Sequence, residues 1–186
     1  WADVSGPKGG ITWVTLDAPL VQVGGITATL LNSQSNPDVW RSRVEPTQRI
    51  YSWAMNNHWG TNYRAYQEGP VVFRFVLRPH SGYDPAEASR FAASRTQPLL
   101  VLPDSEVRPA SPALVRVEPA DVIVLGIKPS DDGKALIVRL FGAGGKDAEA
   151  RLAWAEPPRR TWRSDTSEQP LAPQDGPVRV PAFGVV

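Results

Sequence analysis

The chain has no cysteine and only two histidines, His58 and His80. The lack of cysteine excludes disulfide bonds, thiolate metal ligands and a cysteine nucleophile. The two histidines lie far apart and outside any HxH or HExxH pattern, so the sequence predicts no metal site. His80 follows a strand-like run in RPHSGYD, where a loop or capping role is favoured over catalysis.

Strong net charge and long apolar runs are also lacking. Lys and Arg total 20 against 19 Asp and Glu, which argues against nucleic acid as a partner. No apolar run approaches the roughly 20 residues of a membrane span, and WADVSGPKGG does not resemble a signal peptide. These absences predict no membrane partner and favour the cytoplasm. The chain begins at Trp1 and ends within an apolar alternation at 183–186, so we expect a fragment of a longer protein that would carry any targeting signal.

Period-two alternation of apolar residues dominates the sequence and indicates half-buried β-strands. In VVFRFVLR, we expect one side of the strand to face the core and Arg74 and Arg78 to face away; the core-facing residues would be Val71, Phe73, Phe75 and Leu77. Further strands are expected at 11–16, 20–23, 50–55, 114–117, 122–127, 135–141, 151–154 and 178–180.

One segment, YDPAEASRFAAS, has the pattern of a helix. Asp84 is placed as its N-cap, Pro85 at its first position and Glu87 for a capping box. The 15 glycines and 19 prolines fall mainly between apolar runs, as an antiparallel sandwich requires. We therefore predict an all-β fold, an antiparallel β-sandwich with one short helix, as a single domain over residues 1–186. Long loops are expected near 32–48 and 156–177.

Motifs for catalysis are sparse. The chain has neither a Gly-x-Ser-x-Gly elbow nor a phosphate-cradling glycine loop, and GAGG at 142–145 reads as a turn. Asp131 and Asp132 could form the carboxylate pair that a glycosidase needs. Their place between a strand and Gly133 favours a β-turn instead.

Polar and aromatic side chains are concentrated in SWAMNNHWGTNYRAYQEGP, residues 52–70. Amides, a guanidinium and aromatic faces are the groups that bind sugar hydroxyls and the apolar face of a pyranose. The alternative is that Asn56-Asn57 and Gly60-Thr61-Asn62 form turns while the aromatic rings pack inward.

Three blocks together resemble the C-terminal region of bacterial α-mannosidases of glycoside hydrolase family 38. They are ITWVTLDAPLVQVGG, SWAMNNHWGTNYRAYQEGPVVFRFVLRPH and IKPSDDGKALIVRLFG. The resemblance covers roughly residues 10–142, and the proline-rich tail from Pro157 lies outside it. FGAGG replaces the aromatic-Asn pair expected after the IVRL strand, which predicts a turn of different length and shape.

The resemblance implies a β-sandwich of the galactose-mutarotase-like supersandwich type, preceded in the parent protein by a (β/α) catalytic domain and a small helical bundle. The zinc ligands and the aspartate nucleophile of the family belong to that catalytic domain, and no residue here matches them. A loop of the family's β-region approaches the catalytic cleft, and this role falls on Asn56–Arg64. The expected substrate-binding residues are Asn56, Asn57, His58, Trp59, Asn62 and Arg64.

The resemblance therefore predicts a non-catalytic accessory domain of a retaining α-mannosidase. Its expected partners are the parent's own N-terminal catalytic domain and an α-mannoside, with no cofactor in this chain and zinc in the catalytic domain. Two alternatives remain: a free-standing carbohydrate-binding module, and a purely structural or oligomerisation domain.

Overall fold

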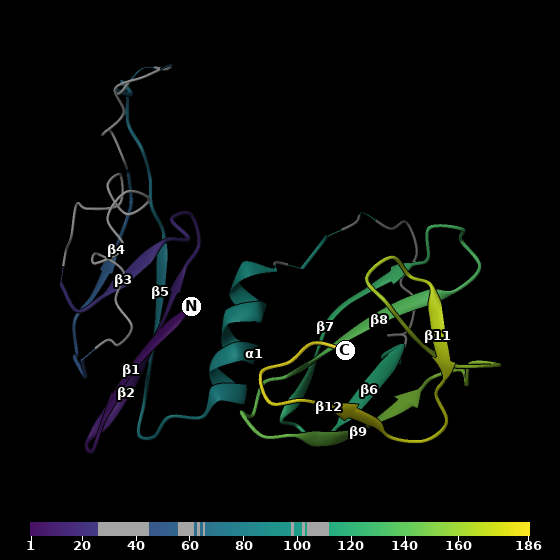
Figure 1. Cartoon of the computed structure of the whole chain (residues 1–186). Helices are drawn as coiled ribbons and strands as arrows, with labels where there is room; N and C mark the ends of the chain where they lie inside the picture. Colours follow the sequence, from purple (N-terminus) through teal and green to yellow (C-terminus); the bar gives the residue numbers. More distant parts are fainter. Residues whose placement is uncertain are drawn as a thin grey trace. The chain divides into compact units, whose positions relative to one another are not determined.

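A computed structural model describes residues 1–25, 45–55, 62, 64, 66–97, 99–101, 103 and 112–186. Within these residues lie twelve strands and one helix (Figure 1). Every pairing between two named strands is antiparallel. The predicted class, an antiparallel all-β fold with one short helix, is confirmed. The supersandwich subtype stays a prediction.

The chain divides into two compact units. Unit 1 comprises Trp1–Tyr83 and Ala92–Gln97, and unit 2 comprises Asp84–Phe91 and Pro98–Val186. Each is described by itself below. That the 186 residues form one domain stays a prediction.

Unit 1 contains a three-stranded sheet in the order β1-β2-β5 and a two-stranded pair of β3 with β4. The bounds are β1 Ala2–Gly6, β2 Gly9–Thr15, β3 Val21–Val23, β4 Ile50–Ser52 and β5 Phe75–His80. The tight β1–β2 hairpin turns at Pro7-Lys8, and Gly9 adopts the left-handed φ of 122° that glycine tolerates. Strand β1 itself is not among the expected strands.

The register of this sheet decides which side chains are buried, because directly opposite residues of an antiparallel pair lie on one face. Thr12 lies opposite both Asp3 and Arg78, and Val14 lies opposite Val76. Thr12 and Val14 are buried. We call the face that carries these residues the inner face.

The predicted orientation of the VVFRFVLR run is wrong. Only its second half lies in β5, and there Phe75 and Leu77 are 41% and 60% exposed. Arg78 lies on the inner face and is half-buried, whereas Arg74 is exposed, as predicted, and pairs with Asp17 at 2.8 Å. The physical reason is that both faces of the run carry apolar residues. The alternation of side chains assigns residues to two faces but does not tell which face is covered.

Helix α1, Pro85–Thr96, begins as predicted. The Asp84 carboxylate accepts a hydrogen bond from the Glu87 backbone N–H at 2.9 Å, which satisfies one of the free donors of the first turn. The Glu87 carboxylate pairs with Arg90 one turn later, at 2.7 Å. Asp84 is thus confirmed as the N-cap, and the charged first turn suits the helix dipole.

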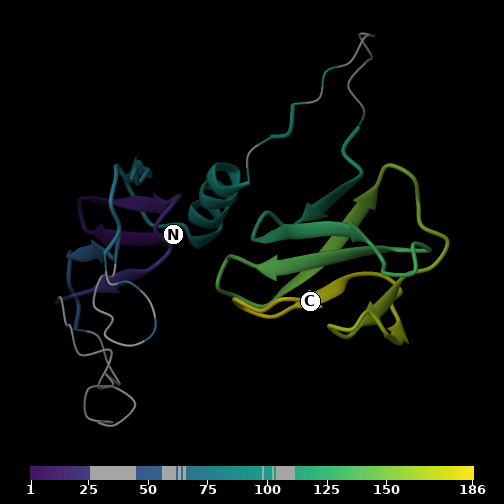
Figure 2. The ribbon, with the colours of Figure 1, turned by 90° about the horizontal axis from the view of Figure 1, so that it is seen from above.

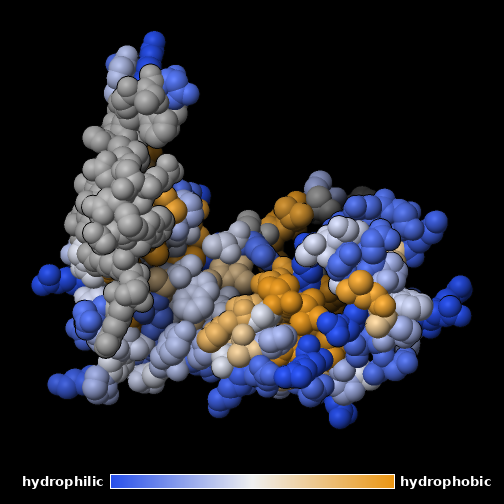
Figure 3. Space-filling view, viewed as in Figure 1, coloured by the Kyte–Doolittle hydropathy of each residue, from blue (hydrophilic) through white to orange (hydrophobic). Residues whose placement is uncertain are grey.

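Unit 2 is a two-layered β-sandwich. One layer is the sheet β12-β9-β6 and the other is the β7–β8 hairpin. Valine, leucine and alanine side chains from both layers form its core, in which Val122, Leu140, Ala150 and Val180 are buried. Burial of each large side chain is worth about 1.5–3 kcal/mol. Apolar side chains also reach the surface of this unit, and Figure 3 shows them gathered on its visible face. The bounds are β6 Val115–Glu118, β7 Val122–Pro129, β8 Leu136–Gly142, β9 Ala148–Trp154 and β12 Val178–Val180.

The proline-rich stretch predicted as a long loop near 156–177 contains a short hairpin. Strands β10, Trp162–Ser164, and β11, Pro170–Pro173, pair with each other, with an irregularity between Arg163 and Ser164. Proline at both ends of β11 hides the strand from pattern analysis, because proline removes a donor and is rare inside strands. The corresponding loop prediction near 32–48 falls largely outside the described residues.

The FGAGG turn after β8 is shaped by close contact with the last residues of the chain. Residues 182–186 run beside β8 (Figure 2), with hydrogen bonds between Leu140 and Val186 in both directions. A Cβ on Gly142 would lie closer than 3.0 Å to the Pro181 carbonyl oxygen, and one on Gly145 would lie 2.8 Å from the Phe183 ring. The glycines therefore allow the C-terminal segment to pack against β8.

This packing predicts that Gly142→Ala destabilises the chain. The added methyl group meets backbone rather than a flexible side chain, and such overpacking costs about 1–3 kcal/mol. Gly126→Ala is the matched control, because Gly126 lies in β7 and its Cβ would meet nothing within 4 Å. Thermal denaturation of both variants tests this expectation. Equal melting temperatures for the two would contradict it.

Candidate functional site

A partly buried polar cluster joins the three strands of unit 1. The Asp3 carboxylate accepts hydrogen bonds from the hydroxyls of Ser5 and Thr12, the latter at 2.7 Å, and lies 2.8 Å from His80 Nε2. The Asp3 and His80 side chains are only 6% and 11% exposed. We call these four residues the Asp3 cluster. It links β1 to β5 across β2.

The pKa of Asp3 reflects two opposing effects. Burial favours the neutral acid and acts to raise the pKa, whereas the hydrogen bonds from Ser5, Thr12 and His80 stabilise the carboxylate. The hydrogen bonds prevail, so the pKa of Asp3 lies below its usual 3.8. Asp3 is therefore ionised at neutral pH and acts as an acceptor.

The cluster lacks the geometry of a nucleophile–base pair. Ser5 donates to the Asp3 carboxylate rather than to the imidazole, and His80 Nδ1 is buried without a hydrogen-bond partner. A serine nucleophile needs its hydroxyl within reach of the base that takes its proton. His80 is the last residue of β5, and its contact with Asp3 joins that strand to β1.

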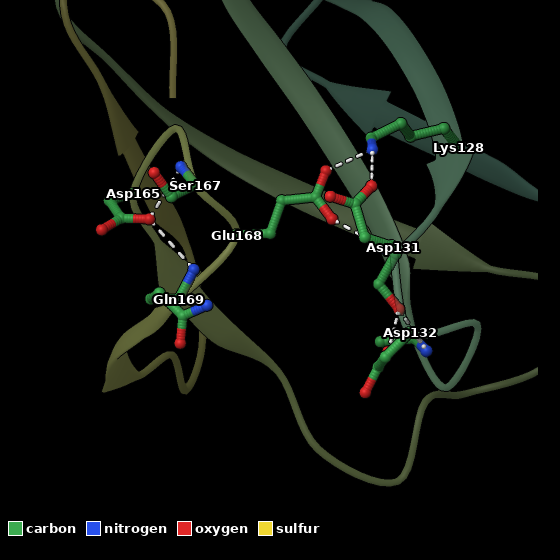
Figure 4. Close-up of polar contacts among 9 residues, drawn as sticks. Lys128, Asp131, Asp132, Asp165, Ser167, Glu168 and Gln169 are labelled. Carbon is green, nitrogen blue, oxygen red and sulfur yellow. Dashed lines mark hydrogen bonds and ion pairs between the residues drawn. The ribbon is translucent and has the colours of Figure 1, made fainter.

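A second polar cluster lies in unit 2, where two turns meet (Figure 4). Lys128, near the end of β7, pairs with Asp131 at 2.9 Å and with Glu168 from the turn between β10 and β11. The other Glu168 carboxylate oxygen accepts a hydrogen bond from the Asp131 backbone N–H at 3.0 Å. We call these three residues the Lys128 cluster. Glu168 has a left-handed φ of 63°, an unfavourable conformation that these contacts hold in place.

The structure places Asp131 and Asp132 in a turn, as favoured from the sequence. The Asp132 carboxylate accepts hydrogen bonds from the Ser130 hydroxyl at 2.7 Å and the Lys134 backbone N–H at 3.0 Å. Gly133 has a φ of 71°, as a tight turn requires.

The charges of this turn do not suit acid catalysis. The hydrogen bond from Ser130, followed by that from Lys134, holds the pKa of Asp132 below its usual range. The contacts with Glu168 and then Asp131 raise the pKa of Lys128. A glycosidase needs one carboxylic acid with a raised pKa to protonate the leaving group. The Lys128 cluster joins two turns instead.

The predicted sugar-binding residues fall mostly outside the described part of the chain. Asn56, Asn57, His58 and Trp59 lie outside it. Asn62 and Arg64 are described, and both are exposed. The Arg64 guanidinium carbon lies 5.6 Å from the centroid of the Tyr66 ring, which is itself exposed. This distance is typical of a cation–π contact.

Two kinds of feature are absent from the residues that the structure describes. Among them, no group of three or more His, Asp or Glu side chains could hold a metal ion. Their helix is too short and too polar to cross a membrane.

Sequence analysis missed the Asp3 cluster because β1 lacks a strong apolar alternation. The signal that could have found it is the spacing of Asp3 and Ser5, which places both on one face of any strand through them. The role of Glu168 was missed because its partner, Lys128, lies far away in the sequence.

The Asp3 cluster predicts a specific response to acid. The pKa of Asp3 is lower in the folded state than its usual value of 3.8, so the ionised carboxylate stabilises the fold at pH values above 3.8. This stabilisation is lost as the pH falls through the pKa of the folded state. Asp3→Asn is expected to cost about 1.5–3 kcal/mol at neutral pH. Between neutral pH and about pH 2, the melting temperature of the variant should also fall less than that of the wild type.

The matched control is Asp147→Asn. Asp147 also has a lowered pKa, caused first by the backbone N–H of Ala182 and then by Arg179, but its side chain is 55% exposed. Solvent screens such pairs, so the control should melt close to wild type. Melting curves of the wild type and of both variants across this pH range test the prediction. A wild-type acid profile for Asp3→Asn would contradict the stabilising role.

The chain was compared with known protein families, curated proteins and solved structures. Residues 121–182 match the model of the glycosyl hydrolases family 38 C-terminal beta sandwich domain. No curated protein and no solved structure matches the chain.

The match confirms the predicted family resemblance over that segment and extends it into the proline-rich tail, whereas the resemblance of residues 10–120 stays a prediction. The resemblance was placed at roughly residues 10–142, whereas the matched segment overlaps that range only at its end. The proline-rich tail from Pro157, expected to lie outside, is inside as far as residue 182. The matched segment holds the β7–β8 hairpin, β9 to β12 and the Lys128 cluster.

Proposed function

We propose that this chain, whose residues 121–182 match a family 38 glycosyl hydrolase C-terminal β-sandwich domain, is the non-catalytic C-terminal part of a retaining α-mannosidase. The family match carries the proposal. In this reading, the chain packs against the parent's own N-terminal catalytic domain, which holds zinc and the nucleophile. The substrate is an α-linked mannoside.

The distribution of charged groups supports a non-catalytic role. In unit 2, Lys128 pairs with Asp131 and Glu168, Arg179 pairs with Asp147, and the Lys134 backbone N–H donates to Asp132. The Asp3 carboxylate of unit 1 is engaged by Thr12 and His80, and little of its side chain is exposed. Catalysis of glycoside hydrolysis needs two carboxyl groups of unlike pKa facing one open site.

We also propose that segment 56–64 contributes side chains to the parent's substrate cleft. Its described members support this reading, because Asn62 and Arg64 are exposed and Arg64 lies over the exposed ring of Tyr66. A guanidinium donates several hydrogen bonds in a fixed plane, which suits vicinal sugar hydroxyls. Asn56, Asn57, His58 and Trp59 would provide further donors and an aromatic platform.

The exposed Arg64–Tyr66 pair also favours a second candidate function. An aromatic ring with an adjacent planar donor could bind sugar without a catalytic domain. Calorimetric titration of the purified 186-residue chain with methyl α-mannoside separates the two. Saturable binding by the isolated chain favours a carbohydrate-binding module.

The cleft proposal predicts a kinetic effect of Asn57→Ala and Arg64→Ala in the full-length enzyme. Loss of a neutral hydrogen bond to substrate costs on the order of 1–1.5 kcal/mol, and loss of a charged donor about 1.5–3. This corresponds to a fall of about tenfold to a hundredfold in kcat/KM. Arg163→Ala, which removes an exposed arginine from β10, is the control and should leave kcat/KM unchanged. Lower melting temperatures with unchanged kinetics would show that the segment only packs against its own unit.

The non-catalytic role predicts no turnover of an aryl α-mannoside by the isolated chain, with or without added zinc. No residue of this chain matches the zinc ligands that the resemblance implies, and the two histidines, His58 and His80, are far apart in the sequence. A chromogenic assay of the isolated chain measures the rate of hydrolysis, and the full-length enzyme serves as the positive control. Turnover by the isolated chain would make Glu68, Asp131 and Asp132 the candidates for catalysis.

A further inference from the structure

The β10–β11 hairpin of unit 2 lies almost entirely at the surface. Among the described residues, its two strands pair only with each other, and a ribbon of two strands is marginally stable in water. Every residue from 162 to 173 is exposed except Glu168, whose side chain is only 11% exposed. None of these residues is among those that form the apolar core of the sandwich. The position of the hairpin therefore depends on other contacts.

The turn of the hairpin is built by Asp165. Its carboxylate accepts hydrogen bonds from the backbone N–H groups of Ser167 at 2.9 Å and Gln169 at 3.0 Å (Figure 4). Its backbone carbonyl accepts a third from the Glu168 N–H at 3.0 Å. These contacts are local, so they shape the turn without attaching it to the sandwich.

Glu168 makes the polar contacts that attach this turn to the rest of unit 2. Its side chain extends toward the end of β7, where one carboxylate oxygen pairs with Lys128 and the other accepts the Asp131 N–H at 3.0 Å (Figure 4). In the part of the chain that the structure describes, no other residue of 162–173 forms a hydrogen bond or ion pair with a residue outside that range.

The backbone of Glu168 is strained. Its φ of 63° is left-handed, a conformation that glycine and asparagine adopt more readily than glutamate does. Strain of this kind persists only where surrounding contacts maintain it. The turn geometry alone would favour another residue, so the presence of glutamate is explained by its contacts with Lys128 and Asp131.

The turn that receives Glu168 is stabilised by its own hydrogen bonds. The Ser130 N–H donates to the Ala135 carbonyl, and the Gly133 N–H donates to the Ser130 carbonyl, both at 2.9 Å. Lys128 also pairs with Asp131 at 2.9 Å, so its ammonium group keeps a partner without Glu168. Loss of the Glu168 contacts would therefore leave the β7–β8 turn in place.

We propose that the β10–β11 hairpin is a salt-sensitive conformational unit, whose docked position depends on the contacts of Glu168 with Lys128 and Asp131. When these contacts break, residues 162–173 leave the β7–β8 turn while the sandwich stays folded. Salt favours this release, because the Lys128 side chain is 42% exposed and its attraction to Glu168 is partly screened.

Amide hydrogen exchange of the 186-residue chain tests the proposal with Glu168→Gln, Lys128→Met and the double variant. Each single variant is expected to speed exchange at 165–169 by about fivefold to twentyfold, because an undocked two-stranded hairpin frays. The double variant should be no faster than the singles, since both remove one interaction. Exchange in β8 and β9 should change less than about twofold, and the melting temperature by less than about 2 °C.

Salt and a control variant sharpen the test. Raising NaCl from about 50 mM to about 1 M should speed exchange at 165–169 about twofold to threefold in the wild type and leave Glu168→Gln unchanged. Arg179→Gln removes another exposed ion pair of unit 2, with Asp147 at 3.0 Å, and should leave exchange at 165–169 at the wild-type rate.

Four outcomes would overturn the proposal. Wild-type exchange at 165–169 as fast as in an unstructured chain would show that the hairpin is not held. Unchanged exchange in both single variants would show that other contacts hold it. Equal acceleration in β8 and β9, with a matching fall in melting temperature, would show that the hairpin opens only with the sandwich. Slower exchange in Glu168→Asn, which tolerates the left-handed backbone but cannot reach as far, would show that strain rather than contact governs the hairpin.

Discussion

The pairing of β2 with its two neighbours determines how unit 1 distributes its side chains between core and surface. Once Thr12 lies opposite Asp3 and Arg78, every second residue of the three strands lies on the same side as Thr12. A shift by one residue would expose the Asp3 carboxylate to solvent and would bury Trp13 and Leu77 instead. The hydrogen bonds of Asp3 with Thr12 and His80 oppose that shift, because they form only in the observed register. A polar network thus selects the register that leaves an apolar face exposed.

Unit 2 obeys the same geometry with a different result. The β7–β8 pairing places Val122, Val124 and Leu140 on the side that meets the β12-β9-β6 sheet, so this unit has an apolar core. Its ion pairs lie at the surface, where the Lys128 cluster joins the turn after β7 to the turn between β10 and β11. The backbone of residues 182–186 extends the layer of β8, and the small residues of FGAGG make room for it. The charged contacts of unit 2 therefore hold two turns together. In unit 1, the contacts of the charged Asp3 carboxylate stabilise one strand register instead.

Much of the fold could be predicted from local sequence patterns. Asp84 and Pro85 mark the start of the helix, and Pro129 to Gly133 mark the β7–β8 turn, because caps and turns depend on few neighbouring residues. The buried face of β5 could not be predicted, since Phe75, Val76 and Leu77 offer two apolar faces. The β10–β11 hairpin was hidden by proline, and Glu168 joins Lys128 across a long stretch of sequence. Of the predicted site, Asn62 and Arg64 are described and exposed, and Asn56 to Trp59 lie outside the described residues.

The two units of the chain differ in how they bury their apolar side chains. The family match covers residues 121–182 in unit 2, where the sandwich has its own apolar core. In unit 1, the three-stranded sheet buries Thr12 and Val14 on its inner face and leaves Ile11, Phe75 and Leu77 exposed. A sheet of this kind gains little from its apolar residues until a second layer covers them, because the hydrophobic contribution scales with the area removed from water.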